Sequence, residues 1–345
     1  MTASPRPAAS PAPVGPGHEQ ALLAAINLAR LAPSLHNTQP WRWRVSGPVA
    51  ELHSDPDRAV PIADPWGREM LLGCGATLQH ARSVLAAAGW RVAVSRLPDP
   101  TEPDLVARLE LVEPASPAAE EARLAEAIPH RHTDRRPYTA RRLPADVLQT
   151  LQQAAEQEHA HLLLVTEPDD RLDLAALTDL ANRIQIADED YTAELVTWSG
   201  ERTDSAGIPA GLVPHLEAPR HTDVPVRDFE VSRPGQLPVT GTVDEEPAWC
   251  VLFTDSDTRL DHLRAGEAMA RLLLTATDLG VASCPQSQAV EVPGARVLLE
   301  ARLLAGLGHA QLVLRLGWPD PDGEPLPRSP RRALSEIVQV DKDPA

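Results

Sequence analysis

The chain has 345 residues, of which 43% are hydrophobic, and it carries a formal net charge of −17 at pH 7. This length is enough for one large domain or two packed halves, and the acidic balance argues against nucleic acid or an anionic membrane as a partner. No apolar run approaches the ~20 residues that span a bilayer, and the three cysteines (Cys74, Cys250 and Cys284) lack metal-ligand spacing, which favours reduced thiols in the cytoplasm.

The first part of the chain predicts a disordered tail and then a helix that ends at a polar loop. Residues 1–17 are rich in Pro and Ala and contain no apolar signal core, which favours disorder. Residues 18–31 place apolar side chains at helical spacing, and Pro33 ends this helix because its ring disfavours a helical residue before it. Two short strands are expected next, at Trp41–Val45 and Val49–His53.

The remaining periodic segments predict helices and strands in two successive halves. In residues 18–130 we expect a long helix, two strands and a short helix, at Gly67–Ala88, Trp90–Arg96, Leu105–Val112 and Pro117–Ile128. In residues 131–345 we expect helix Asp146–Glu158, strand His161–Val165, helix Arg171–Asp190, strand Ala248–Phe253, helix Leu260–Leu279 and strand Gln311–Gly317. The stretch 182–247 is a long insertion whose later part is Pro-rich and acidic, and loops of this length are usually lids, binding loops or disordered.

The two long predicted helices carry matching residues at one constant offset. Gly75 and Gly89 of the first correspond to Gly266 and Gly280 of the second, and each helix follows a strand and an Asp-rich turn. Chance similarity between amphipathic helices is the alternative. The shared order of elements favours an internal duplication, in which one chain imitates a two-fold dimer with one central helix from each half at the pseudo-interface.

The polar loop before the first strand is the most informative stretch. It reads Pro33-Ser34-Leu35-His36-Asn37-Thr38-Gln39-Pro40-Trp41 and places several hydrogen-bonding side chains between a helix and a strand. This arrangement suits a flat molecule with hydrogen-bonding edges, and the alternative is a helix-ending turn that leads into a core strand. The pattern Pro-Ser-x-x-Asn-x-Gln-Pro-Trp resembles the nitroreductase family of FMN-dependent oxidoreductases. The resemblance implies that Pro33, Ser34, His36, Asn37 and Gln39 bind FMN.

A dense basic run opens the second half of this acidic chain. It reads His130-Arg131-His132-Thr133-Asp134-Arg135-Arg136, and guanidinium groups match phosphate oxygens in bidentate geometry. A solvated basic turn is the alternative. The run resembles the Arg-Arg-Ser-x-Arg segment with which nitroreductase domains hold the FMN phosphate, although His132 stands where the family usually has a second Arg. The resemblance implies cofactor-binding roles for Arg131, His132, Thr133 and Arg135.

Two further segments resemble the same family. Residues 317–332 resemble its closing strand, turn and phosphate-contacting Arg or Lys, which implies that Arg331 and Arg332 bind FMN. The predicted loop at 280–287 resembles the segment whose backbone reaches the reactive edge of the flavin, which implies Gly280 and Ser283. A basic tail and an ordinary small-residue loop are the alternatives.

The motifs together predict one complete FMN site per chain. The ring cradle lies only in residues 18–130 and the phosphate grip only in residues 131–345, so the site is built across the halves and its symmetry mate is inactive. This combination resembles the Acg-type, dormancy-associated nitroreductase-like branch of actinobacteria, from His18 to Val338. The resemblance implies an α+β, nitroreductase-like fold of two fused halves, each with a mixed or antiparallel sheet and helices.

The resemblance also implies an activity. FMN would take a hydride from NAD(P)H and pass electrons to a small-molecule acceptor, either nitroaromatic or quinone-like, with no catalytic side chain for the hydride step. The alternative is a flavin-sequestering protein without turnover, in which the insertion forms a closed lid. No metal site is predicted, because no ligand spacing is present. A fused pseudo-dimer is expected to be a monomer or to form a homodimer, in the cytoplasm.

Overall fold

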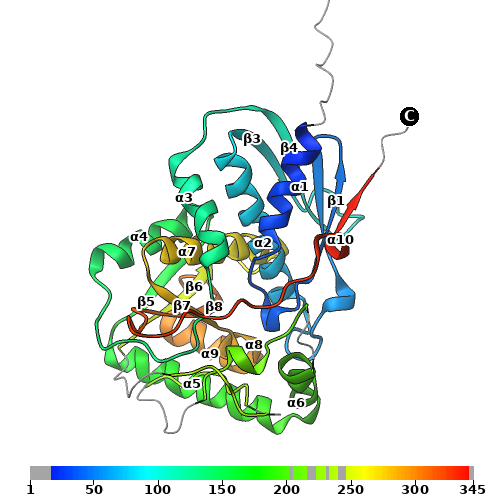
Figure 1. Cartoon of the computed structure of the whole chain (residues 1–345). Helices are drawn as coiled ribbons and strands as arrows, with labels where there is room; N and C mark the ends of the chain where they lie inside the picture. Colours follow the sequence, from blue (N-terminus) through cyan, green and yellow to red (C-terminus); the bar gives the residue numbers. More distant parts are fainter. Residues whose placement is uncertain (1–16, 202–204, 216–222, 231–232, 240–245, 342–345) are drawn as a thin grey trace, which may run out of the picture.

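The computed structural model describes residues 17–201, 205–215, 223–230, 233–239 and 246–341. Its helices and strands form two sheets with helices packed between and around them, which confirms the predicted α+β class (Figure 1). The predicted disordered tail lies outside the described residues except for Gly17, which begins the first helix. None of the described helices is long and apolar enough to cross a membrane.

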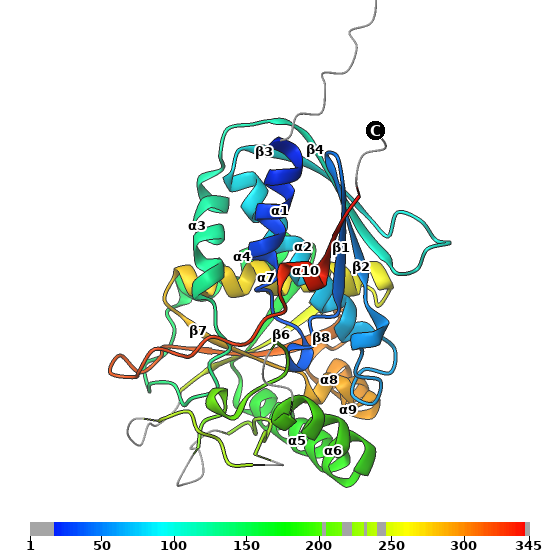
Figure 2. The same ribbon diagram turned by 45° about the vertical axis from the view of Figure 1, so that its right-hand side comes forward.

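The first sheet is built mainly from the first half of the chain. Its elements are, in chain order, α1 (Gly17–Ala29), β1 (Trp41–Ser46), β2 (Val49–Ser54), α2 (Arg68–Ala87), β3 (Trp90–Arg96), β4 (Leu105–Pro114) and α3 (Ala119–Ala127). Strand β1 alternates buried Trp41, Trp43 and Val45 with exposed residues, as expected of a strand with one face on the core. The strand order is β3-β4-β2-β1-β9, with antiparallel pairing among the first four. The last strand, β9 (Val338–Val340), pairs with β1 in parallel although it is far away in sequence (Figure 2).

The second sheet is built from the second half. Its strands are β5 (His161–Val165), β6 (Ala248–Thr254), β7 (Ala282–Gln286) and β8 (His309–Gly317), in the antiparallel order β5-β6-β8-β7. The helices of this half are α4 (Ala145–Glu156), α5 (Pro168–Ala187), α6 (Glu189–Val196), α7 (Arg259–Asp278), α8 (Gln288–Glu291), α9 (Pro293–Leu299) and α10 (Leu334–Ile337). Helices α5, α8 and α9 lie together on the side of this sheet away from α1 (Figure 1).

The two central helices α2 and α7 meet at a pair of glycines. A Cβ added to Gly75 would lie 2.0 Å from the carbonyl oxygen of Leu263, and a Cβ added to Gly266 would lie 2.1 Å from that of Leu72. Only glycine allows such a close backbone approach. The same offset along the sequence separates Gly75 from Gly266 and Leu72 from Leu263, so equivalent residues make reciprocal contacts. This reciprocity supports the predicted duplication.

Part of the structure differs from the sequence prediction. The predicted loop at 280–287 is wrong for residues 282–286, which form strand β7. This strand lies at the edge of its sheet, where the missing N–H of Pro285 is tolerated. The helix predicted at 171–190 ends earlier, because the Asp188 side chain accepts hydrogen bonds from the backbone N–H groups of Asp190 and Tyr191 and caps a new helix, α6.

Candidate functional site

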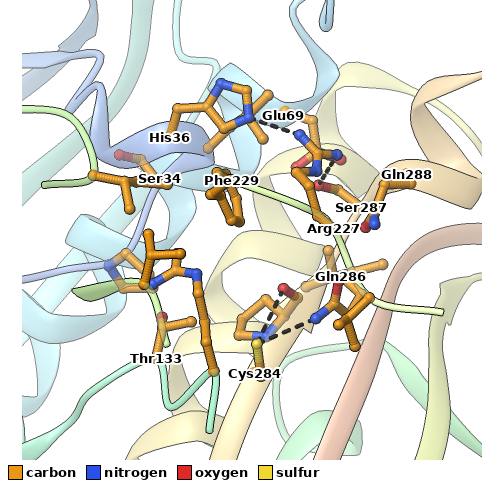
Figure 3. A pocket seen from close by; sticks show the side chains of 18 of the residues that line it. Ser34, His36, Glu69, Thr133, Arg227, Phe229, Cys284, Gln286, Ser287 and Gln288 are labelled. Carbon is orange, nitrogen blue, oxygen red and sulfur yellow. Dashed lines mark hydrogen bonds between the residues drawn. The ribbon is translucent and has the colours of Figure 1, made fainter. Parts of the chain in front are cut away.

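A cavity of about 340 Å³ lies where the two halves of the chain meet. Its walls come from the loop at 33–36, the start of α2, residues Thr133 and Arg135, parts of the insertion at 208–230, and residues 284–288 around the end of β7. The volume is in the range of about 300–1,000 Å³ that is typical of small-molecule sites. Figure 3 shows that Cys284 and Gln286 lie on one side of the cavity, with His36 and Glu69 on the other.

The loop between α1 and β1 has an unusual backbone. His36, Asn37 and Gln39 have φ angles of 46°, 55° and 54°, in the left-handed region that non-glycine residues rarely adopt. The hydroxyl of Ser34 closes the loop by accepting a hydrogen bond from the backbone N–H of Gln39 at 2.9 Å. Each such residue costs about 1–3 kcal/mol, and this kind of strain concentrates at functional sites.

Three of the five residues predicted in this loop line the cavity, and two do not. Pro33, Ser34 and His36 are lining residues. The amide nitrogen of Asn37 instead donates to the carbonyl oxygens of Gly207, at 3.0 Å, and Pro330, at 2.9 Å. The amide of Gln39 donates to the carbonyl of Ser205 at 2.8 Å and accepts from the backbone N–H of Arg332 at 2.9 Å. These two amides therefore fasten the insertion and the C-terminal segment onto the loop.

We expect Asn37→Ala to lower the free energy of unfolding by about 2 kcal/mol, because two buried hydrogen bonds of roughly 1 kcal/mol each are lost. Chemical denaturation followed by circular dichroism measures this change. Asn27→Ala, on the exposed face of α1, is the matched control and should change stability by less than ~0.5 kcal/mol. Equal midpoints for the two variants would contradict the fastening role of Asn37.

The basic run at 131–136 is held rigidly at the cavity wall. The backbone N–H of Asp134 donates to the carbonyl of Ser283 at 2.9 Å, and the buried guanidinium of Arg315 donates to the carbonyl of Arg136 at 2.5 Å. The Arg315 guanidinium also stacks 3.9 Å from the centre of the Tyr138 ring. The loop therefore presents Thr133 and Arg135 to the cavity from a fixed backbone.

Next to this loop lies a cluster of basic side chains, which consists of Arg131, Arg331, His132 and His80; Arg131 and His80 are buried, and the other two are partly buried. Arg131 and Arg331 both donate to the carbonyl of Leu31, at 3.5 and 3.1 Å, so their guanidinium groups lie side by side. The Nε and Nη1 atoms of Arg131 and the Nε of Arg331 have no hydrogen-bond partner among the described residues. No carboxylate in the described part of the chain forms an ion pair with either arginine.

The electrostatics of this cluster favour an anionic ligand. Burial lowers the pKa of Arg131 to about 10 and, together with the Arg131 charge, that of Arg331 to about 9. Burial and the same arginine lower the pKa of His132 to about 4, and His80 is held neutral by burial and by both arginines, which lower its pKa well below 6.5. Buried charges are normally paired. A dianionic phosphate would supply the missing charge and accept hydrogen bonds from several of these groups.

The insertion contributes residues that no sequence motif indicated. Arg227 lies 2.7 Å from Nε2 of His36 and donates to a carboxylate oxygen of Glu291 at 2.6 Å. An arginine can only donate, so Nε2 of His36 accepts and the ring is neutral; burial, then Arg227 and Arg135, lower the His36 pKa. The centre of the Phe229 ring lies 4.9 Å from the guanidinium of Arg135 and 5.9 Å from that of Arg227. Figure 3 shows Phe229 and Arg227 at the cavity. Segment 226–230 is thus clamped across the cavity.

Glu69, at the start of α2, is a second lining residue that sequence reasoning missed. Its side chain is buried, and Oε1 accepts a hydrogen bond from Nη2 of Arg68 at 2.6 Å. Burial raises its pKa to about 7, against the lowering effect of Arg68. The sequence offered no signal for it, because an acidic residue in the first turn of a helix is common on structural grounds alone.

The remaining predicted residues, Gly280, Ser283 and Arg332, do not line the cavity. Gly280 is exposed where α7 ends, and Ser283 is buried with its carbonyl bound to Asp134. The cavity wall begins at the next residue, Cys284. The backbone N–H of Arg332 donates to the side chain of Gln39 in the loop. The Nε atom of Arg332 has no hydrogen-bond partner among the described residues. The flavin roles of these three residues stay predictions.

No family model matches the chain. Two proteins of Mycobacterium tuberculosis, Putative NAD(P)H nitroreductase Rv3131 and Putative NAD(P)H nitroreductase acg, are 37% and 36% identical to it. The first alignment covers 91% of this chain and 90% of the relative, and the second covers 92% and 95%. Among solved structures, the FMN-dependent nitroreductase NfnB of Mycobacterium smegmatis in complex with NADPH is a distant match, with 18% identity, a TM-score of 0.40 and coverage of 64% of this chain and 99% of that one.

Proposed function

Because the chain belongs to the nitroreductase family, we propose that it is an FMN-dependent oxidoreductase that uses NAD(P)H to reduce a nitroaromatic or quinone-like acceptor. The observation that carries the proposal is the pair Arg131 and Arg331, in which Nε and Nη1 of Arg131 and Nε of Arg331 lack hydrogen-bond partners among the described residues. Arg131 lies two residues before Thr133, which lines the cavity. The names of the relatives and the loop pattern Pro-Ser-x-x-Asn-x-Gln-Pro-Trp support the same cofactor.

The residues present fit both the phosphate and the ring of FMN. The phosphate would be held by Arg131, Arg331 and the hydroxyl of Thr133, where neither arginine forms an ion pair with a carboxylate of the described residues. The ring would lie in the cavity, between the loop at 33–36 and residues 284–288. When bound, FMN supplies two-electron hydride chemistry that no side chain can perform.

The protein's own contribution is placement, electrostatics and exclusion of water. The cation of Arg135 would stabilise negative charge that develops on a bound ring, since preorganised charges act strongly in a site without water. Arg227 and Phe229 line the cavity and would limit the access of water to a bound ring. The strained loop at 34–39 fixes His36 against Arg227.

One site per chain remains the expected number. The residue that matches His80 at the offset of the two glycine pairs is Arg271. Its guanidinium donates to Glu120 at 2.8 Å and to Glu121 at 2.7 Å. Carboxylates of α3 thus surround Arg271, whereas the matching His80 is neutral and its ring nitrogens have no hydrogen-bond partner among the described residues. This difference supports an inactive symmetry mate.

The second candidate function, flavin sequestration without turnover, is favoured by the clamp of Arg227. This residue joins segment 226–230 both to His36 in the cradle and to Glu291 in α8, at 2.7 and 2.6 Å. A nicotinamide that must stack on the ring would have to displace the segment. The two functions therefore differ in whether segment 226–230 can move away from the cavity.

An anaerobic absorbance titration with NADPH and NADH tests both. We expect purified protein loaded with FMN to be yellow and to bleach within seconds. We expect the Arg227→Ala variant to bleach faster still, because segment 226–230 would then be released from the cavity. Arg183→Ala, on the exposed face of α5, should bleach at the wild-type rate. Bleaching of the unchanged protein by dithionite alone would favour sequestration. A protein that cannot be loaded with FMN would defeat both functions.

A further inference from the structure

The cavity wall contains one buried carboxyl group that the hydride chemistry does not use. Glu69 is 6% exposed and lines the cavity from the first turn of α2. Oε1 accepts from Arg68, and among the described residues Oε2 accepts no hydrogen bond. A carboxyl group with one fixed oxygen and one free oxygen in a ligand cavity is well placed to pass a proton to that ligand.

The charges around Glu69 allow it to exist in both protonation states. Arg68 is fixed by the carbonyl oxygens of Gln311 and Val290, at 2.6 and 3.2 Å, so its charge stays next to the carboxyl. Arg227 adds a further positive charge, while Asp64 and Glu291 oppose ionisation. Burial is the largest influence and raises the pKa to about 7. Glu69 thus holds a proton near neutral pH, and Arg68 can stabilise the carboxylate that remains after the proton leaves.

The other titratable groups of the wall are unsuited to this task. His36 is neutral and accepts at Nε2, so loss of its remaining proton would leave an imidazolate. Asp228 is exposed, and the carboxylate of Glu230 is bound by His215 and by the N–H of Gly235, which lower its pKa. Arg135 and Arg227 do not deprotonate. Cys284 accepts a hydrogen bond from the amide of Gln286.

We propose that Glu69 is the proton donor to the electron acceptor bound in the cavity. This inference rests on the proposed function, because the acceptor would receive its hydride from reduced FMN. A quinone becomes a quinol by gaining one hydride, which carries both electrons, and one proton. The O–H bond of Glu69 breaks, its proton bonds to the acceptor oxygen, and the electron pair stays on the carboxylate beside Arg68. Water then returns a proton to Glu69.

The first test reads the proton itself, without turnover. Infrared spectra of the full protein between pH 4 and pH 9 should contain the carbonyl stretch of a buried protonated carboxyl that disappears near pH 7. The band should be absent from Glu69→Gln, which is nearly isosteric. It should persist in Glu194→Gln, since Glu194 is a carboxyl of raised pKa that binds the backbone of Ile62 and Ala63 outside the cavity wall. A band that survives in Glu69→Gln would overturn the proposal.

The second test separates the two half-reactions by stopped flow with 1,4-benzoquinone as the acceptor. In FMN-loaded protein, oxidation by the quinone should slow above pH 7. In Glu69→Gln it should be about 100-fold slower and independent of pH, with partial recovery in Glu69→Asp. Reduction by NADPH should be the same in all three proteins. An unchanged rate and pH profile in loaded Glu69→Gln would overturn the role of Glu69 alone, whereas failure to load FMN would overturn the proposed function.

Discussion

Replacement of Gly75 by alanine is expected to destabilise the fold by about 3 kcal/mol, the upper end of the usual cost of overpacking. The new Cβ would lie 2.0 Å from the carbonyl oxygen of Leu263, which is backbone and cannot rotate away. The two central helices would have to separate, and the core packed around them would loosen. Urea denaturation followed by circular dichroism measures the loss.

Gly294→Ala is the matched control for this substitution. Gly294 lies in helix α9, has a helical backbone, and has no heavy atom within 4 Å of its added Cβ. Alanine there should leave stability unchanged or raise it by up to ~1 kcal/mol, through the helix propensity alone. If Gly75→Ala and Gly294→Ala shifted the urea midpoint equally, α2 and α7 could not be in the close contact described here.

Arg131→Met is expected to have opposite effects on the empty and the flavin-loaded protein. In the empty protein a buried, unpaired charge is replaced by an apolar side chain of similar length, which should be neutral or stabilise by about 1–4 kcal/mol. In the loaded protein a charge-assisted hydrogen bond to the phosphate is lost, which is worth roughly 1.5–3 kcal/mol. FMN should therefore bind about 10- to 150-fold more weakly.

Thermal melts of the empty protein and quenching of FMN fluorescence measure the two effects. Arg302→Met is the control, because Arg302 is half-exposed and paired with Asp173; it should leave the affinity for FMN unchanged. Weaker FMN binding combined with an unchanged or higher melting temperature would assign Arg131 to the ligand and not to the fold. An unchanged affinity would contradict the phosphate site.

The sequence allowed most of the regular elements to be predicted. The long helices α2 and α7 and the strand β1 were predicted within one or two residues, whereas α5 was displaced by three residues at each end. Strand β9 could not be predicted, because three residues are too few to show the alternation of buried and exposed side chains that indicates a strand. Its pairing also depends on a partner almost 300 positions away. Strand β7 was missed because Pro285 argues against a strand unless the strand is known to lie at an edge.

The site was predicted where motifs are local and missed where contacts are distant. Ser34, His36, Thr133 and Arg135 lie in short patterns, and the structure brings them to one cavity. Arg227 reaches His36 across 191 positions, and nothing in its own neighbourhood indicates this contact. The pattern around Asn37 and Gln39 specifies which side chains are present, but not that their amides also bind carbonyl groups of the insertion and of the C-terminal segment.

The parallel pairing of β9 with β1 also sets the order in which the molecule can be completed during synthesis. Strand β1 leaves the ribosome early, yet the partner for its outer edge emerges after every other described element. Until then β1 is an unprotected sheet edge that can pair with another chain. Arg331 and Arg332 lie in the segment that leads to β9, so the cluster of basic side chains is incomplete for the same period. A nascent chain therefore gains a protected edge and the last residues of the proposed phosphate site in one late step.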